Sequence, residues 1–88
     1  MQVCAEAEKT VDNVMRAIPA PYAKMVSIDG KVLVVEVRFL GRSWSRRYPD
    51  PERLQSAPVM RELLADPLKE WAVRGRATNA SMLSAMGN

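Results

Sequence analysis

The residues best suited to contact a partner lie in one stretch, residues 37–49, which contains four arginines, a tryptophan and a tyrosine but no acidic residue. Arginine guanidinium groups donate charge-assisted hydrogen bonds to phosphates, and exposed aromatic rings offer faces on which unpaired bases stack. A two-stranded ribbon also fits the width of a DNA major groove. The stretch is therefore the first candidate for a nucleic-acid-binding surface.

The predicted binding set joins this stretch to two arginines from residues 74–88, a second segment without acidic residues. Its members are Arg38, Arg42, Trp44, Arg46, Arg47, Tyr48, Arg74 and Arg76. In the nucleic-acid interpretation the arginines contact phosphates, and Trp44 or Tyr48 stacks on a base. Because Trp, Tyr and Arg are also enriched at protein–protein hot spots, a protein partner is the alternative. A third interpretation places both rings in the core and leaves the arginines as solubilising residues at a sheet edge.

The chain contains few residues of the types that usually carry out catalysis. The absence of histidine removes the commonest general base and the Ser-His and Cys-His nucleophile pairs. The four glycines are isolated, so they form no phosphate-binding loop. We therefore expect no enzymatic activity.

One pattern leaves an enzymatic alternative open. The spacing of Asp29 and Glu36 loosely resembles that of the two strand carboxylates that bind magnesium in metal-dependent nucleases, although Arg38 stands where such sites usually carry lysine. The simpler expectation is that Asp29 forms a turn and that Glu36 pairs with a basic neighbour across the sheet.

Composition also limits the cofactors and the compartment. Cys4 is the single cysteine, so it forms no internal disulfide, and without histidine it has no companions for a zinc site. We expect no metal and no other cofactor. The N-terminus has no signal-peptide pattern, and no apolar run approaches the roughly 18 residues of a membrane span. These features predict a cytoplasmic protein that does not contact a membrane.

Length and charge describe a small, polarised protein. The 88 residues suit one domain, residues 1–88, which buries about 60 to 65% of its unfolded surface, so self-association into a homodimer would add useful stability. The formal net charge is +3, yet residues 1–13 hold three acidic side chains and one lysine. This asymmetry favours an anionic partner or a polarised protein interface.

The elements that position the ribbon follow from hydrophobic periodicity. Val11, Val14, Met15 and Ile18 fall at i, i+3, i+4 and i+7, which predicts a helix over about residues 4–17.

The repeat of the apolar residues then changes from 3.6 residues, typical of a helix, to two residues, typical of a strand. Residues 31–40 alternate between apolar and mixed positions, with Leu33, Val35, Val37 and Phe39 on one face. Asp29-Gly30 before this run predicts a hairpin with a type I′ turn. A second turn around residues 40–42 leads to a third strand, about residues 43–48, on which Trp44, Arg46 and Tyr48 share a face.

Helix signals follow the predicted sheet. Asp50 and Pro51 have the residue types of an N-cap and a first helical position. Further short helices are predicted from Ser56 and from Asp66, the latter ending at Gly75. A last short helix is expected within residues 79–88, where the chain, like residues 1–3, is expected to fray.

These elements predict an α+β fold: an N-terminal helix, a three-stranded antiparallel meander, and two or three short helices packed on one face of the sheet. The function favoured is that of a non-enzymatic regulatory module that binds nucleic acid through the ribbon. The alternative is a protein-binding adaptor or small inhibitor that uses the same ribbon or dimerises through a strand edge.

Overall fold

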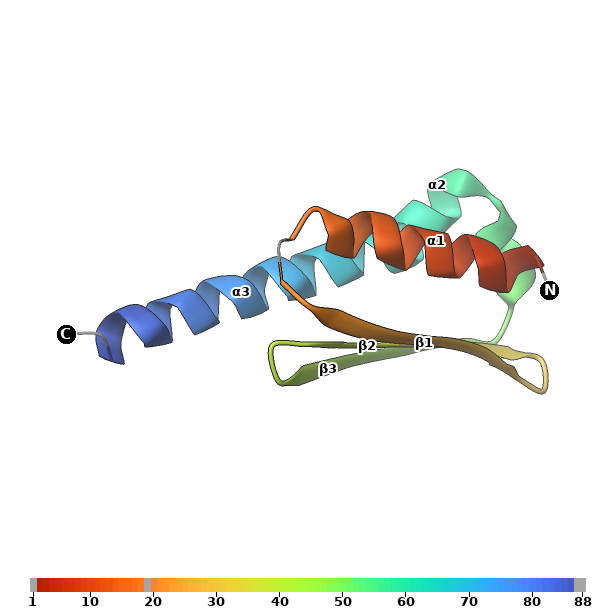
Figure 1. Ribbon diagram of the computed structural model, residues 1–88. Coiled ribbons are helices and arrows are strands. Elements are labelled where there is room, and N and C mark those ends of the chain that lie inside the picture. The colour runs from red at the N-terminus through yellow and green to blue at the C-terminus, as the bar shows by residue number, and fades with distance from the viewer. Residues whose placement is uncertain (1, 19, 87–88) are drawn as a thin grey trace.

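The fold is a two-layer α+β arrangement in which helices cover one face of a three-stranded sheet (Figure 1). The computed structural model describes residues 2–18 and 20–86, with side chains up to residue 76. The elements, in chain order, are α1 (Gln2–Arg16), β1 (Tyr22–Asp29), β2 (Val32–Phe39), β3 (Arg42–Tyr48), η1 (Pro51–Gln55), α2 (Ala57–Met60), η2 (Arg61–Ala65) and α3 (Asp66–Met86). The predicted fold class and meander are confirmed.

Helix α1 packs on the sheet through one stripe of side chains. Val3, Ala7, Val11 and Met15 recur every four residues and are at most 1% exposed. Residues four apart lie on the same side of a helix, so this spacing gives α1 one apolar face to bury.

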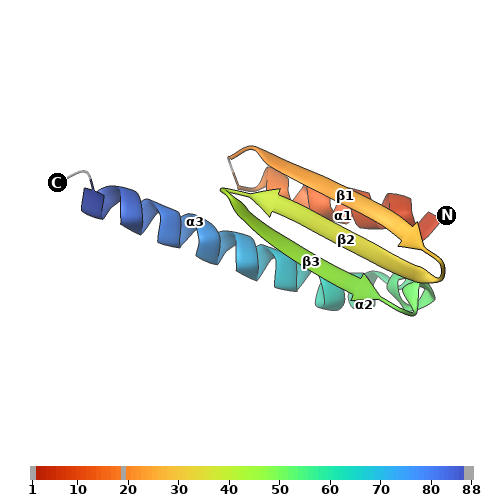
Figure 2. The same cartoon turned by 90° about the horizontal axis from the view of Figure 1, so that it is seen from below.

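The sheet has the order β1-β2-β3 with both pairs antiparallel, so β2 is the central strand. The predicted inward face of β2 is confirmed, because Leu33, Val35, Val37 and Phe39 are all buried. Figure 2 views the sheet from the opposite side, which none of the described helices covers. One face of the sheet therefore forms the core with the described helices, and the other is left uncovered by them.

The first hairpin turn differs from the prediction by one residue. Asp29 pairs with Val32, so the two-residue loop is Gly30-Lys31, and of these two residues only Gly30 has a positive φ, of 65°. This is the pattern of a type II′ turn, which requires positive φ at its first central position alone. Placing glycine there lets the strand pairing continue through Asp29.

The type I′ pattern occurs instead in the second hairpin. Leu40 and Gly41 have φ values of 53° and 73°, and both central residues of a type I′ turn need positive φ. Leucine rarely adopts this conformation, which costs about 1 kcal/mol. The extension of the pairing to Phe39 and Arg42 holds it there.

The sheet leads into a 3₁₀ turn, η1, where the sequence predicted the start of a helix; Pro51 is at its first position, as predicted. The Asp50 side chain makes no capping hydrogen bond, however. Its backbone carbonyl accepts from the Arg53 N–H at 3.2 Å. The proline therefore sets the start of the turn without help from the carboxylate.

Beyond η1 the chain forms one helical run over residues 57–86, where the sequence predicted several short helices. A new start at Asp66 was predicted because Pro67 cannot donate to the carbonyl four residues earlier, that of Leu63. The structure accommodates the proline with the π-helical turn η2, and the Tyr48 hydroxyl donates to the Leu63 carbonyl at 2.7 Å. A side chain from the sheet thus replaces the missing backbone donor.

Gly75 does not end the helix either, so this part of the prediction is wrong. A glycine terminates a helix by adopting positive φ, and among the described glycines only Gly30 and Gly41 do so. A Cβ on Gly75 would lie 2.9 Å from Nη1 of Arg42. The glycine remains helical and leaves room for that guanidinium group.

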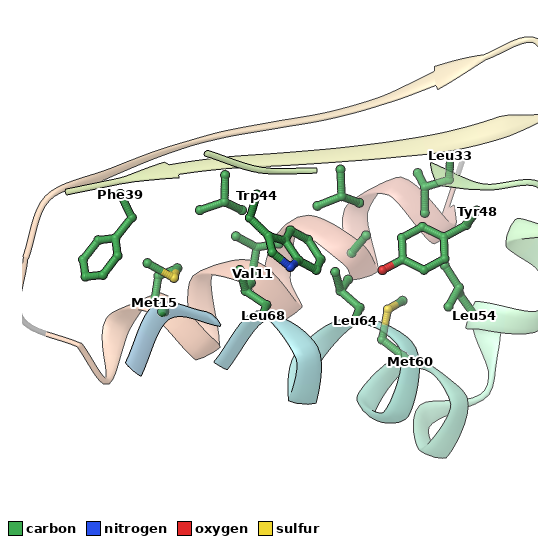
Figure 3. Close-up of a cluster of buried hydrophobic side chains, with 14 of the residues drawn as sticks. Val11, Met15, Leu33, Phe39, Trp44, Tyr48, Leu54, Met60, Leu64 and Leu68 are labelled. Carbon is green, nitrogen blue, oxygen red and sulfur yellow. The ribbon is translucent and has the colours of Figure 1, made fainter. Parts of the chain in front are cut away.

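The core lies between the sheet and the helices (Figure 3). It combines the inward residues of β2 with side chains from α1, with Leu54 of η1, and with residues of the C-terminal helical run, including Met60, Leu64 and Leu68. Helix α3 continues past the end of the sheet (Figures 1 and 2), and the molecule measures 50 × 23 × 17 Å. None of the described helices is both long and apolar enough to cross a membrane.

Candidate functional site

The two aromatic residues of β3 belong to the core. The sequence had left open whether they lie in the core or on a binding surface. Trp44 and Tyr48 are 4% and 9% exposed and point from the sheet toward the helices (Figure 3). Register explains this, because they lie opposite Val37 and Leu33 on the buried face of β2. Neither ring offers a face to a base, so the stacking role predicted for them is wrong.

The arginines of the ribbon lie on two different faces. Alternation places Arg38 and Arg47 on the uncovered face of the sheet, where each has an acidic neighbour. Arg38 Nε is 3.4 Å from Glu36 Oε1, and Arg47 Nη2 is 3.8 Å from Asp29 Oδ2. The positive charges of this face are therefore locally balanced by Glu36 and Asp29, although residues 37–49 contain no acidic residue.

The two carboxylates with nuclease-like spacing are not brought together. Met25, not Asp29, lies opposite Glu36, and Asp29 is four residues further along β1, about 13 Å at the usual strand rise. The structure contains no group of three or more potential metal-ligating side chains among the residues it describes. The simpler expectation holds only in part, because Glu36 pairs with Arg38 of its own strand, and Asp29 is the last strand residue before the turn.

Arg42 and Arg46 both lie on the helix-facing side of β3, four residues apart along the outer edge of the sheet. The Arg42 guanidinium lies 5.8 Å from the ring centre of Trp71, and that of Arg46 lies 5.0 Å from the ring centre of Trp44. Neither forms an ion pair with a described residue. We call this pair the arginine edge; it is the acid-free remnant of the predicted surface.

The two C-terminal arginines do not extend the arginine edge as one patch. Arg74 pairs with Glu70 on α3, with Nη2 and Oε1 2.7 Å apart. Arg76 lies on another side of α3 and faces α1. Two residues along a helix are about 200° apart, which separates these side chains.

Arg76 lines a groove of about 1080 Å³ between α1 and the C-terminal helical run. We call it the interhelix groove. Its apolar lining includes Val3, Val14, Ile18, Met60, Ala65 and Val73. One wall adds Arg61, Lys69 and Arg76, whereas the α1 wall adds Gln2, Glu6, Thr10 and Asn13.

Sequence reasoning missed this groove, although it had one available signal. Arg61, Lys69 and Arg76 are spaced by eight and seven residues, close to two helical turns each, so they share one side of a continuous helix. The predicted breaks at Asp66 and Gly75 concealed that pattern. None of the three forms an ion pair with a residue that the structure describes.

A polar cluster elsewhere joins α1 to β1. Asp12 accepts hydrogen bonds from the Tyr22 hydroxyl, at 2.5 Å, and from Lys24 Nζ. The Lys24 hydrogen bond, followed by that of Tyr22, lowers the pKa of Asp12, and the same contacts with Asp12 raise the pKa of Tyr22 and of Lys24. The cluster is a partly exposed structural tie between α1 and β1.

Cys4, the single cysteine, is free, partly buried and packed against the core. Comparison of the chain with protein-family models, with curated proteins and with solved structures found no match.

Proposed function

We propose that this chain is a non-enzymatic binding module whose main binding surface is the interhelix groove and whose partner is another protein. The observation that carries the proposal is the combination of an apolar lining with one basic wall in this groove of about 1080 Å³. This retains the protein-binding alternative and moves it from the β3 ribbon to the helical layer.

The groove suits a protein segment better than a small molecule. Its lining runs from Gln2 along α1 and on to Ile18 just beyond that helix, so the groove is elongated. Its volume of about 1080 Å³ reaches the top of the range of about 300–1000 Å³ for compact ligand sites. Small-molecule sites also place a few polar groups around one point. Here the charged groups Arg61, Lys69 and Arg76 are spread along one wall.

The groove also suits protein better than nucleic acid. Single-stranded nucleic acid binds on aromatic platforms, and the described lining includes no aromatic residue. Its apolar side chains, such as Val14 and Val73, offer nothing to phosphates. Apolar side chains of a protein segment would bury this surface at about 25 cal/mol per Å².

The test is selection of binding segments from a randomised peptide-display library, with two matched variants. Ala65→Trp fills the groove without changing its charge, and Ala23→Trp makes the same change on the uncovered sheet face. We expect selected peptides to bind the parent chain and Ala23→Trp but to lose binding to Ala65→Trp. Recovery of no binders, or equal binding to both variants, contradicts the proposal. Circular dichroism of both variants verifies folding.

Nucleic-acid binding is retained as a second candidate because the arginine edge has no acidic partner among the described residues. The contacts of Arg42 with Trp71 and of Arg46 with Trp44 orient two guanidinium groups from one strand. Two arginines on one strand face, four residues apart, match the charge-assisted recognition of a phosphate backbone.

Fluorescence anisotropy with labelled single-stranded DNA, duplex DNA and RNA tests this candidate at two salt concentrations. Replacing Arg42 and Arg46 by alanine should weaken duplex binding and reduce its salt slope by up to about 2, since each phosphate contact contributes about 0.9. The matched control replaces Arg38 and Arg47, which have acidic neighbours. Unchanged binding after the first replacement, or an equal loss in the control, rules out the arginine edge.

A further inference from the structure

The interhelix groove is long enough to hold about four turns of helix. Fifteen residues separate Arg61 from Arg76, which corresponds to about 22 Å at 1.5 Å per residue. The opposite wall has the same extent, from Gln2 to Ala17. Because α1 lies beside η2 and the first part of α3 and runs in the same direction as this helical run (Figures 1 and 2), the groove follows their axes.

The walls of the groove determine which backbone conformation fits. Both walls are helices, whose interior N–H and C=O groups are bonded within the helix, so the groove offers no strand edge. An extended segment would leave its own backbone groups unpaired against Val14, Ile18 and Met60, which is costly. Polyproline segments favour aromatic-lined grooves, and this described lining is aliphatic. A helix satisfies its own backbone and needs only an apolar stripe.

The charges of the groove determine the composition of such a helix. Arg61, Lys69 and Arg76 are about 12 and 10 Å apart along their wall at the usual helical rise. On a helix lying alongside, residues seven or eight apart return to the same flank, so three acidic residues at that spacing would meet all three cations. The α1 wall carries Glu6 as its one described acidic residue and is otherwise neutral.

We infer that the interhelix groove binds an amphipathic α-helix of a partner protein, with apolar residues on the floor and acidic residues facing Arg61, Lys69 and Arg76. This inference rests on the proposed function of the groove and adds the class of its partner. A second copy of the chain fits less well. The acidic residues Glu62, Asp66 and Glu70 recur every four residues, and Glu70 already pairs with Arg74.

Three synthetic peptides of about 16 residues provide the probe. They share one leucine stripe with a helical period and differ only on one flank, where residues seven or eight apart are all Glu, all Gln or all Lys. Each surface ion pair is worth a factor of about two, so at about 0.15 M salt the Glu peptide should bind about tenfold more tightly than the Gln peptide. The Lys peptide should be the weakest. Circular dichroism should show that the Glu peptide gains helix on binding.

Two matched triple variants of the protein locate the charge effect. Arg61→Gln, Lys69→Gln and Arg76→Gln together neutralise the groove wall, and Arg38→Gln, Arg47→Gln and Arg74→Gln remove the same charge elsewhere. The wall variant should lose the tenfold preference for Glu over Gln. The control variant should keep it to within about a factor of two.

Several results would overturn the inference. They are no binding of any peptide at about 1 mM, equal binding of the three peptides, equal losses in the two triple variants, and binding without a gain of helix. A dimer in light scattering that the peptide does not dissociate would assign the groove to a second copy. If display yields peptides that depend on Ala65 but are neither acidic nor helical, the groove remains a protein-binding site and only the helix inference fails.

Discussion

The hydrogen bond from the Tyr48 hydroxyl to the Leu63 carbonyl allows a sharp test of how the C-terminal helical run tolerates its proline. The two oxygens are 2.7 Å apart, and Leu63 is four residues before Pro67, which has no N–H to donate. Tyr48→Phe keeps the buried ring and removes only the donor. We therefore expect a loss of stability with the packing of the ring preserved.

The magnitude follows from the burial of this bond. A net hydrogen bond is worth about 0.5–1.5 kcal/mol, and a fully buried carbonyl left without a donor adds about 1–3 kcal/mol. Because the bond is partly buried, we expect Tyr48→Phe to lower the free energy of unfolding by about 1.5 kcal/mol. For a domain of this size, that lowers Tm by about 6–12 °C.

A double-mutant cycle with Pro67→Ala isolates the cause. Alanine restores the N–H that an α-helix donates to the carbonyl four residues earlier, here that of Leu63, so Tyr48→Phe should cost at least about 0.5 kcal/mol less in that background. Urea denaturation of the four proteins measures the coupling. The reasoning is refuted if Tyr48→Phe costs less than about 0.3 kcal/mol, or if its cost is the same with Pro67 and with alanine.

The same hydroxyl has a pH signature. Burial raises the pKa of Tyr48 from 10.0 to about 12, so the neutral form is favoured in the folded state. The corresponding stability is complete below pH 10 and is lost as pH rises through 12. The difference in unfolding free energy between the parent chain and Tyr48→Phe should therefore shrink between these values. A constant difference across this range would contradict the assignment.

Three further changes test other parts of the fold by chemical denaturation. Gly75→Ala should raise the free energy of unfolding by up to about 1 kcal/mol, because alanine favours helix and only the flexible end of Arg42 must move. A loss of stability would contradict this and show that Arg42 is held firmly. Gly41→Ala should lower it by about 1 kcal/mol although the site has open space, because φ is +73° there, and an unchanged value would contradict this conformation. Hydrogen bonds from Lys24 and Tyr22 lower the pKa of Asp12, so its stabilisation is present above about pH 4 and is lost on further acidification; Asp12→Asn should remove that part of the acid dependence, and an identical acid profile would argue against the tie.

The sequence predicted the sheet well where one strand carries its own pattern. Every second residue of strand β2 from Leu33 to Phe39 is a large apolar side chain, whereas the positions between them include Glu36 and Arg38, so its buried face could be predicted. Strand β3 has arginine on both faces, so alternation groups Trp44 with Tyr48 without saying which way they point. Their direction follows from pairing with β2, which is a tertiary contact that local patterns do not contain.

The C-terminal half was predicted less well because distant residues overrule its local stop signals. Pro67 and Gly75 interrupt an isolated helix, yet here Tyr48 supplies the missing donor and Arg42 occupies the space above the glycine. The same stop signals hid the interhelix groove from the sequence-based prediction. Its basic wall exists only if residues 61–76 form one helical run, and its apolar floor exists only once α1 lies beside that run.

The shared direction of α1 and α3 gives the groove a polarity. The N-terminal ends of α1 and α2 lie at the same end of the molecule (Figures 1 and 2), and each carries a partial positive charge from its aligned peptide dipoles. A helix bound between them is therefore favoured with its negative C-terminal end there, antiparallel to both walls. Spin labels on the two ends of the Glu peptide would reveal this orientation by their distances from a label near Gln2, and a parallel arrangement would contradict it. Orientation would then distinguish correct partners from helices of the same composition whose acidic residues fit only in reverse.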